Sequence, residues 1–422
     1  MEHAVVSDMN LGKRIVRWIS YVGPGIFLMG YNIGTGSVTT MAVSGSLYGM
    51  SLFWALLLSC LFTFIMLVAY GKYTLVTGQT AISSYRNHFG KAVSLFIMFG
   101  LIIGEIAAMM GIMGIVVNLI DEWVVYVSGR HINKIIVTLF IICGLYSLFW
   151  VGRYAKFEKI LMIFVSIIGV CFISSMILVI PEPGEVIKGL VPKIPKEGNA
   201  HLIIAGMAGT TLSAVLFVMR SIVVQEKGWS IDNLKQERRD ALVSAGMMLI
   251  LSGAVMACAA GTLFRERIPV ETALDMVKTL EPMAGKFAIT LFVFGVVSAG
   301  LSTAFPIILI APWLISDYYG KPRNMQSPMY RILAGIAILV GLTVPVFGGR
   351  PVFIMIASQA FQALLMPMVT LAIIFLLNRK DLMKDHRIGI GLNIGCWATF
   401  LFSLVMAYSG FVGLVDSFRR IF

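Results

Sequence analysis

The sequence contains few charged residues. Asp, Glu, Lys and Arg make up 13% of its 422 residues, whereas 58% are hydrophobic. A soluble protein carries about 25% charged residues, so this composition excludes a soluble globular protein. We expect an all-α integral membrane protein, because helices satisfy their own backbone hydrogen bonds in lipid.

Residue patterns typical of catalysis or cofactor binding are also missing. The five cysteines are scattered singly and form no C-x-x-C pair, which excludes a disulfide framework and a thiolate metal site. The five histidines lie in loops or at the ends of apolar runs. No His-Glu-x-x-His motif, nucleophile–base pair or phosphate-binding loop occurs. We therefore expect neither an enzyme nor a bound cofactor.

The first apolar run is not followed by an Ala-x-Ala-like cleavage site, so it is predicted to be a retained helix. The net charge of +12 could indicate a nucleic-acid partner. In a membrane protein, basic loops that face anionic lipid explain this charge better. The lipid bilayer, and no nucleic acid, is the expected partner.

Apolar runs of roughly 20 residues can cross a bilayer, and the sequence contains about eleven of them. The predicted spans are 19–46 (broken), 50–70, 92–120, 135–152, 158–180, 201–224, 241–264, 287–315, 332–347, 351–377 and 389–414. We divide this single transmembrane domain into a cytoplasmic N-terminus (1–18), a first five-helix repeat (19–180), a second, inverted repeat (201–377) and an extra helix (389–414). Between spans, Ser230–Asp240 is predicted as a polar cytoplasmic helix.

The distribution of lysine and arginine predicts the orientation in the cell (plasma or inner) membrane. Most of the 33 basic residues fall on one side if the N-terminus is cytoplasmic, as the positive-inside rule requires. The C-terminus then lies outside. Arg419 and Arg420 at that end run against the rule.

The stretch Asn32–Thr40 interrupts the first span. Gly34 and Gly36 bracket Thr35, with Ser37 directly after them. Each glycine costs about 1 kcal/mol in a helix interior, and a break at membrane depth persists only where it lines a protein cavity. The N–H groups at the start of the following half-helix would attract an anionic group. Alternatively, these glycines only permit close helix packing.

A second run of small and polar residues, Gly206–Ala214, lies in the sixth span. Interrupted helices at corresponding positions of two halves are typical of transporters built from inverted repeats. Thr210, Thr211 and Ser213 are expected to line this break. The two threonines could instead cap the half-helix that follows.

Several short stretches resemble the Nramp family of metal-ion transporters in order and spacing. They are Gly23–Gly25, Gly45–Gly49, Thr77–Gly78 with Arg86, the stretch starting at Glu105, Ser221–Gln225, Gly300–Thr303, and Ser358–Gln359 with Pro367. The resemblance covers most of the chain. It implies a LeuT-like bundle of two inverted five-helix repeats, with helices one and six unwound at mid-membrane.

The positions of that family's metal-ligand motifs carry other residues here. The first-helix motif Asp-Pro-Gly-Asn corresponds to Gly34–Ser37, and the sixth-helix motif Met-Pro-His corresponds to Ser213–Val215. Ile112 and Ile115 replace an acidic pair of the third helix, and Arg220 replaces the second sixth-helix histidine. Transition metals need carboxylate, imidazole or sulfur ligands, and we expect these groups to be gone. The sequence argues less strongly against hydrated magnesium as a substrate than against a transition metal, because magnesium keeps several waters when bound.

Three further side chains are candidates for the site. Glu105 is the only acidic residue well inside a span, which suggests a coupling or gating role or else a structural hydrogen bond. Arg220 would add positive electrostatic potential to the cytoplasmic part of the transport pathway. Alternatively, its side chain extends to the inner membrane–water interface. Gln359 is expected to face the site by resemblance, or else to join two helices.

We therefore predict a secondary-active transporter coupled to protons or sodium. The expected substrate is a small organic solute that bears a carboxylate, such as an amino acid, held by the amides of Gly34–Ser37 opposite Thr210–Ser213. The alternative substrate is a divalent metal cation such as hydrated magnesium. A non-transporting membrane sensor is the alternative of another class, although no soluble signalling domain is apparent.

Overall fold

The computed structural model describes residues 34–151, 154–179, 181–196 and 198–421. Within them every regular element is a helix, and ten helices are long and apolar enough to cross a membrane. The predicted all-α membrane class is therefore confirmed. Residues 19–33 of the first predicted span and the predicted cytoplasmic segment 1–18 lie outside the described residues.

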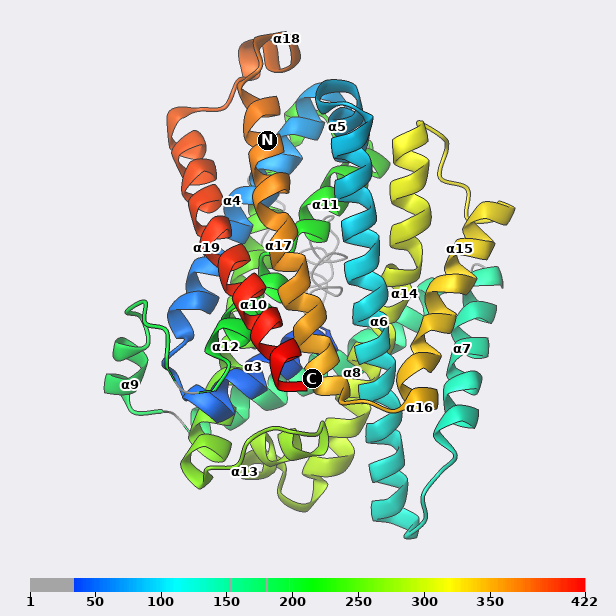
Figure 1. The fold of residues 1–422 in the computed structure, drawn as a ribbon, viewed down its shortest axis with the longest axis vertical. Coiled ribbons are helices and arrows are strands. Elements are labelled where there is room, and N and C mark those ends of the chain that lie inside the picture. The colour runs from blue at the N-terminus through cyan, green and yellow to red at the C-terminus, as the bar shows by residue number, and fades with distance from the viewer. Residues whose placement is uncertain (1–33, 152–153, 180, 197, 422) are drawn as a thin grey trace, which may run out of the picture.

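The helices follow the predicted spans closely (Figure 1). The long elements after the first span are α4 (Phe53–Thr77), α6 (Lys91–Ser128), α7 (Lys134–Val151), α8 (Tyr154–Leu178), α10 (Ala200–Thr211), α11 (Ala214–Glu226), α12 (Leu234–Ala259), α14 (Ala288–Tyr319), α15 (Pro328–Leu339), α17 (Pro351–Asn378) and α19 (Ile390–Ile421). Short helices connect them: α5 (Ala81–Phe89), α9 (Pro183–Lys188), α13 (Glu281–Ala284), α16 (Thr343–Phe347) and α18 (Lys380–Met383).

The second predicted helix break is present in the structure, and the described part of the first span begins at the first predicted break. α3 (Thr35–Tyr48) begins at the first one, with Gly34 as an extended N-cap residue that lacks a side-chain cap. In the sixth span, α10 ends at Thr211 and α11 begins at Ala214, with Ser213 in an extended conformation between them. Because α10 and α11 do not share one hydrogen-bond ladder, backbone groups at the second break are available to a site, as are the first N–H groups of α3.

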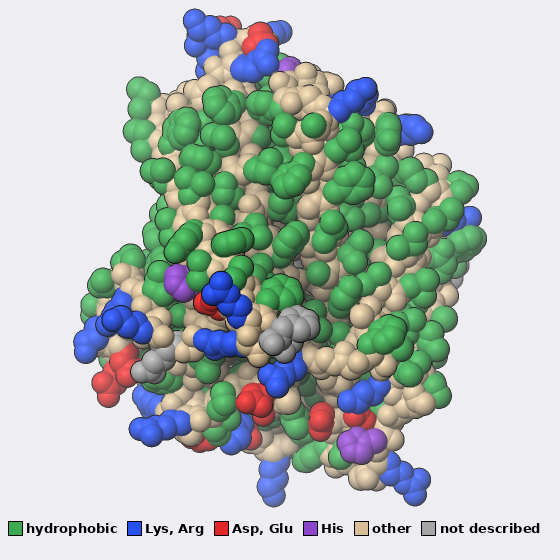
Figure 2. All heavy atoms as spheres, viewed as in Figure 1, with side chains coloured by type: hydrophobic (Ala, Val, Ile, Leu, Met, Phe, Trp, Pro, Cys, Tyr) green, Lys and Arg blue, Asp and Glu red, His purple; other side chains and the backbone are tan. Residues whose placement is uncertain are grey.

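The broken sixth span lies at the centre of the bundle. Every residue of its most apolar window is buried, whereas only 22% of the window in α7 and 39% of that in α19 is buried. Figure 2 shows a broad apolar belt on the visible face, with charged side chains gathered above and below it. This arrangement suits a bundle whose peripheral helices face lipid and whose broken helix is shielded from it.

Backbone contact between α10 and α17 is close. A Cβ atom at Gly209 would lie 1.9 Å from the carbonyl oxygen of Gln359, so only glycine fits at this crossing. The same helix pair carries the second break and the predicted site residue Gln359. Small residues at such crossings let the backbones of membrane helices approach each other.

The segment Ser230–Asp240, predicted as a polar cytoplasmic helix, is helical from Ile231 onward and is continuous with the next span. Residues Ile231–Asn233 form one 3-10 turn, and α12 starts at Leu234 and continues into the next span. Glu237 and Asp240 of this polar segment are both buried. The division into repeats 19–180 and 201–377 with the extra helix 389–414 stays a prediction.

Candidate functional site

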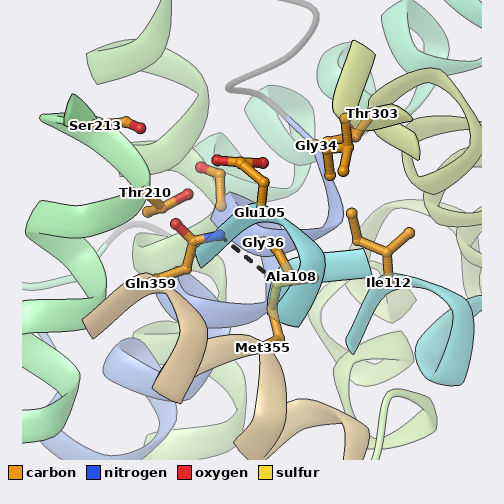
Figure 3. Close-up of a pocket in the computed structure, with 12 residues that line it drawn as sticks. Gly34, Gly36, Glu105, Ala108, Ile112, Thr210, Ser213, Thr303, Met355 and Gln359 are labelled. Atoms are coloured by element: carbon orange, nitrogen blue, oxygen red, sulfur yellow. Dashed lines mark hydrogen bonds between the residues drawn. The ribbon is translucent and has the colours of Figure 1, made fainter. Parts of the chain in front are cut away.

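A pocket lies where the two helix breaks meet (Figure 3). Its volume is about 20 Å³, which is room for roughly one water molecule or one small ion. The lining comes from α3, α6, α10, the start of α11, α14 and α17. The lining residues are Gly34, Gly36, Ser37, Glu105, Ala108, Ile112, Thr210, Ser213, Thr303, Ile307, Met355 and Gln359.

Glu105 supplies the carboxylate of the pocket. It lies on α6, and its side chain is 2% exposed. The Nε2 atom of Gln362 donates a hydrogen bond of 2.7 Å to Glu105 Oε1, and Ser213 Oγ donates one of 3.0 Å to Gln362 Oε1. The carboxylate of α6 is thereby joined through α17 to the break between α10 and α11.

Gln359 and Met355 add an amide and a thioether. They lie one helical turn apart on α17 and therefore share a face. Gln359 Nε2 lies 3.7 Å from Met355 Sδ, the contact drawn as a dashed line in Figure 3. Because the amide nitrogen is turned toward the sulfur, the amide oxygen of Gln359 is left for other partners.

Glu105 is the ionisable side chain among the described residues that line this pocket. The backbone contributes both signs of partial charge, since α10 ends at the break while α3 and α11 begin at theirs. The carboxylate of Glu105, when it carries its charge, therefore decides the sign of the site. A pocket with one carboxylate attracts a cation.

Most of the predicted site residues do meet in this pocket. Gly34, Gly36 and Ser37 of the first break face Thr210 and Ser213 of the second, with Glu105 and Gln359 between them. The Ser37 hydroxyl also bonds the hydroxyl of Ser252 on α12 at 2.9 Å. These positions were predicted from glycines and small polar residues, and the structure brings them together.

Thr35 and Thr211 do not line the pocket. Thr35 is fully buried beside Gly300 of α14, where an added Cβ would lie 2.9 Å from the Thr35 hydroxyl oxygen. The carbonyl oxygen of Thr211 accepts a 2.9 Å hydrogen bond from Thr63 on α4. Thr211 ends α10 rather than capping α11, whose N-cap is Ser213.

Arg220 lies in a buried cluster outside the pocket. Its Nη2 donates to Glu237 Oε2 at 2.7 Å, and its Nη1 donates to Asp240 Oδ2 at 2.5 Å. All three side chains are buried almost completely. The guanidinium charge is thus offset by two carboxylates of α12, which does not match the expected positive potential on the inner pathway.

Met355 and Gln362 escaped the sequence analysis, although helical spacing could have found both. They stand four residues before and three residues after Gln359, so all three lie toward one face of α17. Glu105, Ala108 and Ile112 repeat the same spacing on α6. Met355 and Gln362 could have been found by looking for polar or sulfur-bearing side chains within one helical turn of a predicted site residue.

The sequence predicts the loss of the family's metal ligands, which include carboxylate, amide and thioether groups. They are missing at the family's motif positions, but Glu105, Gln359 and Met355 bring one of each into the pocket. No cluster of three or more His, Cys, Asp or Glu side chains occurs in the described part of the chain. Any ion held here would depend on one carboxylate and on neutral donors.

Comparison with known proteins gives a consistent result. The family model "Natural resistance-associated macrophage protein-like" matches residues 25–413. A "Divalent metal cation transporter MntH" of Caldanaerobacter subterraneus is 22% identical over 397 residues, which span 90% of this chain and 89% of that protein. The "Natural resistance-associated macrophage protein 2 homolog" of Dictyostelium discoideum is 23% identical, over 92% of this chain and 63% of that protein.

Solved structures share the fold. A manganese transporter of Eremococcus coleocola superposes with a TM-score of 0.73 at 14% identity, over 97% of this chain and 90% of that one. Mhp1, a nucleobase-cation-symport-1 family transporter with bromovinylhydantoin bound, gives 0.61 at 15% identity, over 95% and 92%. The inverted-repeat fold with broken helices one and six is thereby confirmed. With its family match from residue 25 to 413, the chain belongs to the Nramp family of membrane transporters.

Proposed function

We propose that this transporter carries a divalent metal cation. One observation supports this most strongly: Glu105 brings a carboxylate into the pocket at the two breaks, where the described lining also offers neutral oxygen donors and one thioether. A buried carboxylate in a membrane protein is costly unless a cation or proton accompanies it. The similarity to a divalent metal cation transporter and to a manganese transporter points the same way.

The donor atoms favour a metal that prefers oxygen. The pocket offers the Glu105 carboxylate, the Gln359 amide oxygen and the hydroxyls of Thr210, Ser213 and Thr303. Magnesium and manganese accept such oxygen ligands, and magnesium keeps several of its waters. Met355 is the one soft donor, and its sulfur would help a softer ion such as cadmium.

An organic carboxylate is the less supported substrate. Its negative charge would meet the carboxylate of Glu105, and the described residues of the lining include no basic side chain. The pocket volume of about 20 Å³ is also far below the roughly 300 Å³ at which pockets for organic ligands begin. The backbone N–H groups at the starts of α3 and α11 remain the argument in its favour.

We further propose that Glu105 couples transport to a second cation, a proton or sodium. A carboxylate buried at membrane depth can hold a metal ion at one stage and a proton or sodium ion at another, so Glu105 would bind the substrate and the coupling ion in turn. We also propose a cytoplasmic N-terminus and an outer C-terminus in the cell membrane, from the distribution of basic residues.

Uptake into proteoliposomes tests the substrate. Vesicles holding the purified protein and a metal-sensitive dye are given Mn²⁺, Mg²⁺, Ca²⁺ or Cd²⁺, and a parallel set receives radiolabelled amino acids and organic acids. We expect metal uptake that Glu105→Gln abolishes, because the amide keeps the size of the side chain and removes its charge.

Glu122→Gln is the matched control, since Glu122 lies on the same helix and does not line the pocket. Its uptake should equal that of the unchanged protein. Accumulation of an organic acid without any metal flux would overturn the proposal.

A further inference from the structure

A second cavity, of about 740 Å³, lies where the start of α10, the start of α17 and the C-terminal end of α19 meet. Arg350 and Arg420 both line it. Leu202, Phe353 and Ile354 provide apolar walls. The cavity is separate from the pocket at the helix breaks, with which it shares no lining residue.

The two arginines make this cavity positive. Neither forms an ion pair with an acidic side chain of the described residues. Arg420 Nη2 donates one hydrogen bond, of 3.4 Å, to the carbonyl of Gly198. Arg350 is the N-cap residue of α17, whose first turn holds no acidic residue, so the positive helix end adds to the charge.

The outer face of α19 indicates that the cavity opens toward lipid. Tyr408, Phe411 and Phe418 on this helix are 65%, 61% and 61% exposed. Large aromatic side chains exposed along a membrane helix are typical of contact with lipid. Figure 2 shows basic side chains gathered below the apolar belt, at the level where α19 ends in Figure 1.

We propose that this cavity binds an anionic phospholipid, with its phosphate between Arg350 and Arg420 and its acyl chains over Phe353 and Ile354. One arginine can donate two parallel hydrogen bonds to the oxygens of a phosphate group. Basic pockets between membrane helices bind anionic lipid head groups. A free phosphate would leave the apolar walls uncovered. The proposal also accounts for Arg420, which runs against the positive-inside rule, by giving it a ligand.

Delipidated protein in detergent tests this site. Native mass spectrometry and thermal unfolding are recorded with phosphatidylglycerol, with phosphatidylcholine of the same acyl chains, and with inorganic phosphate. We expect phosphatidylglycerol alone to form a retained adduct and to raise the unfolding temperature. Each of the variants Arg350→Gln and Arg420→Gln should weaken binding about fivefold, the value expected for one basic residue near an anionic lipid.

Arg419→Gln is the matched control, because Arg419 has the same charge on the same helix but does not line the cavity. It should bind within twofold of the unchanged protein. Equal binding of both lipids, equal stabilisation by inorganic phosphate, or unchanged binding in both single variants would overturn the proposal.

Discussion

Gln362 and Glu105 are joined by a hydrogen bond of 2.7 Å between side chains that stand 257 positions apart in the sequence. Gln362 also accepts a hydrogen bond from Ser213, the residue between the two halves of the sixth span. One amide thus holds the carboxylate of the pocket and contacts the helix break. The state of Glu105 and the geometry of the break are physically connected through this side chain.

Replacing Gln362 by Leu should weaken cation uptake through Glu105. A hydrogen bond to a charged group is worth about 1.5–3 kcal/mol, so the apparent affinity for the metal should fall about tenfold or more. Uptake measured against metal concentration in proteoliposomes checks this result. Thr370→Val on the same helix, where the hydroxyl bonds the carbonyl of Met366 outside the pocket, is the control. Unchanged affinity in Gln362→Leu would contradict the positioning role.

Replacing Met355 by Leu should change the preference among metals. The thioether is the soft donor of the lining, so its removal should lower Cd²⁺ uptake and leave Mg²⁺ uptake close to its original rate. Competition between the two ions in the same vesicles measures the ratio. Met366→Leu, buried on the same helix away from the pocket, should leave the ratio unchanged. An equal fall for both ions would show that Met355 only shapes the pocket.

Replacing Gly209 by Ala should destabilise the protein. The added methyl would lie 1.9 Å from the carbonyl oxygen of Gln359, and a backbone atom cannot rotate away. Overpacking of this kind costs about 1–3 kcal/mol or more. Gly246→Ala in α12 is the control, because nothing lies within 4 Å of its added methyl. Thermal unfolding in detergent should separate the two, and equal unfolding temperatures would refute the close crossing of α10 and α17.

Replacing Arg220 by Met should also destabilise the protein, by about 3–5 kcal/mol, because Glu237 and Asp240 would lose a buried partner. Thermal unfolding of the purified variant measures this loss. Arg239→Met is the comparison, since Arg239 is exposed on the same α12 that carries both carboxylates. Wild-type stability of Arg220→Met would mean that the ion pairs contribute nothing net.

Hydropathy and local residue type were sufficient for much of the architecture. The long helices coincide with apolar runs, because a helix that crosses lipid needs about 20 such residues wherever it packs. Glycines and small polar residues revealed the breaks at Gly34–Ser37 and near Ser213 for a similar reason, since they weaken a helix locally. These are properties of short segments.

The assignment of individual side chains was less complete. Gln359 and Glu105 were expected at the site, and both line the pocket. Arg220 was assigned to the pathway from its spacing to Ser213, but spacing along α11 could not reveal that Glu237 and Asp240 lie opposite it. Met355 was overlooked because methionine is common in apolar helices and carries no signal by itself.

The sequence alone determined that this chain crosses the membrane many times, that two of its helices are interrupted, and that it resembles metal-ion transporters. Only the tertiary structure decided which side chains meet at the interruption. It placed Glu105, Gln359 and Met355 around one pocket and removed Arg220 from it. The reason is physical. Where a helix forms depends mainly on its own residues, whereas the side chains that it contacts depend on how helices distant in sequence cross and pack.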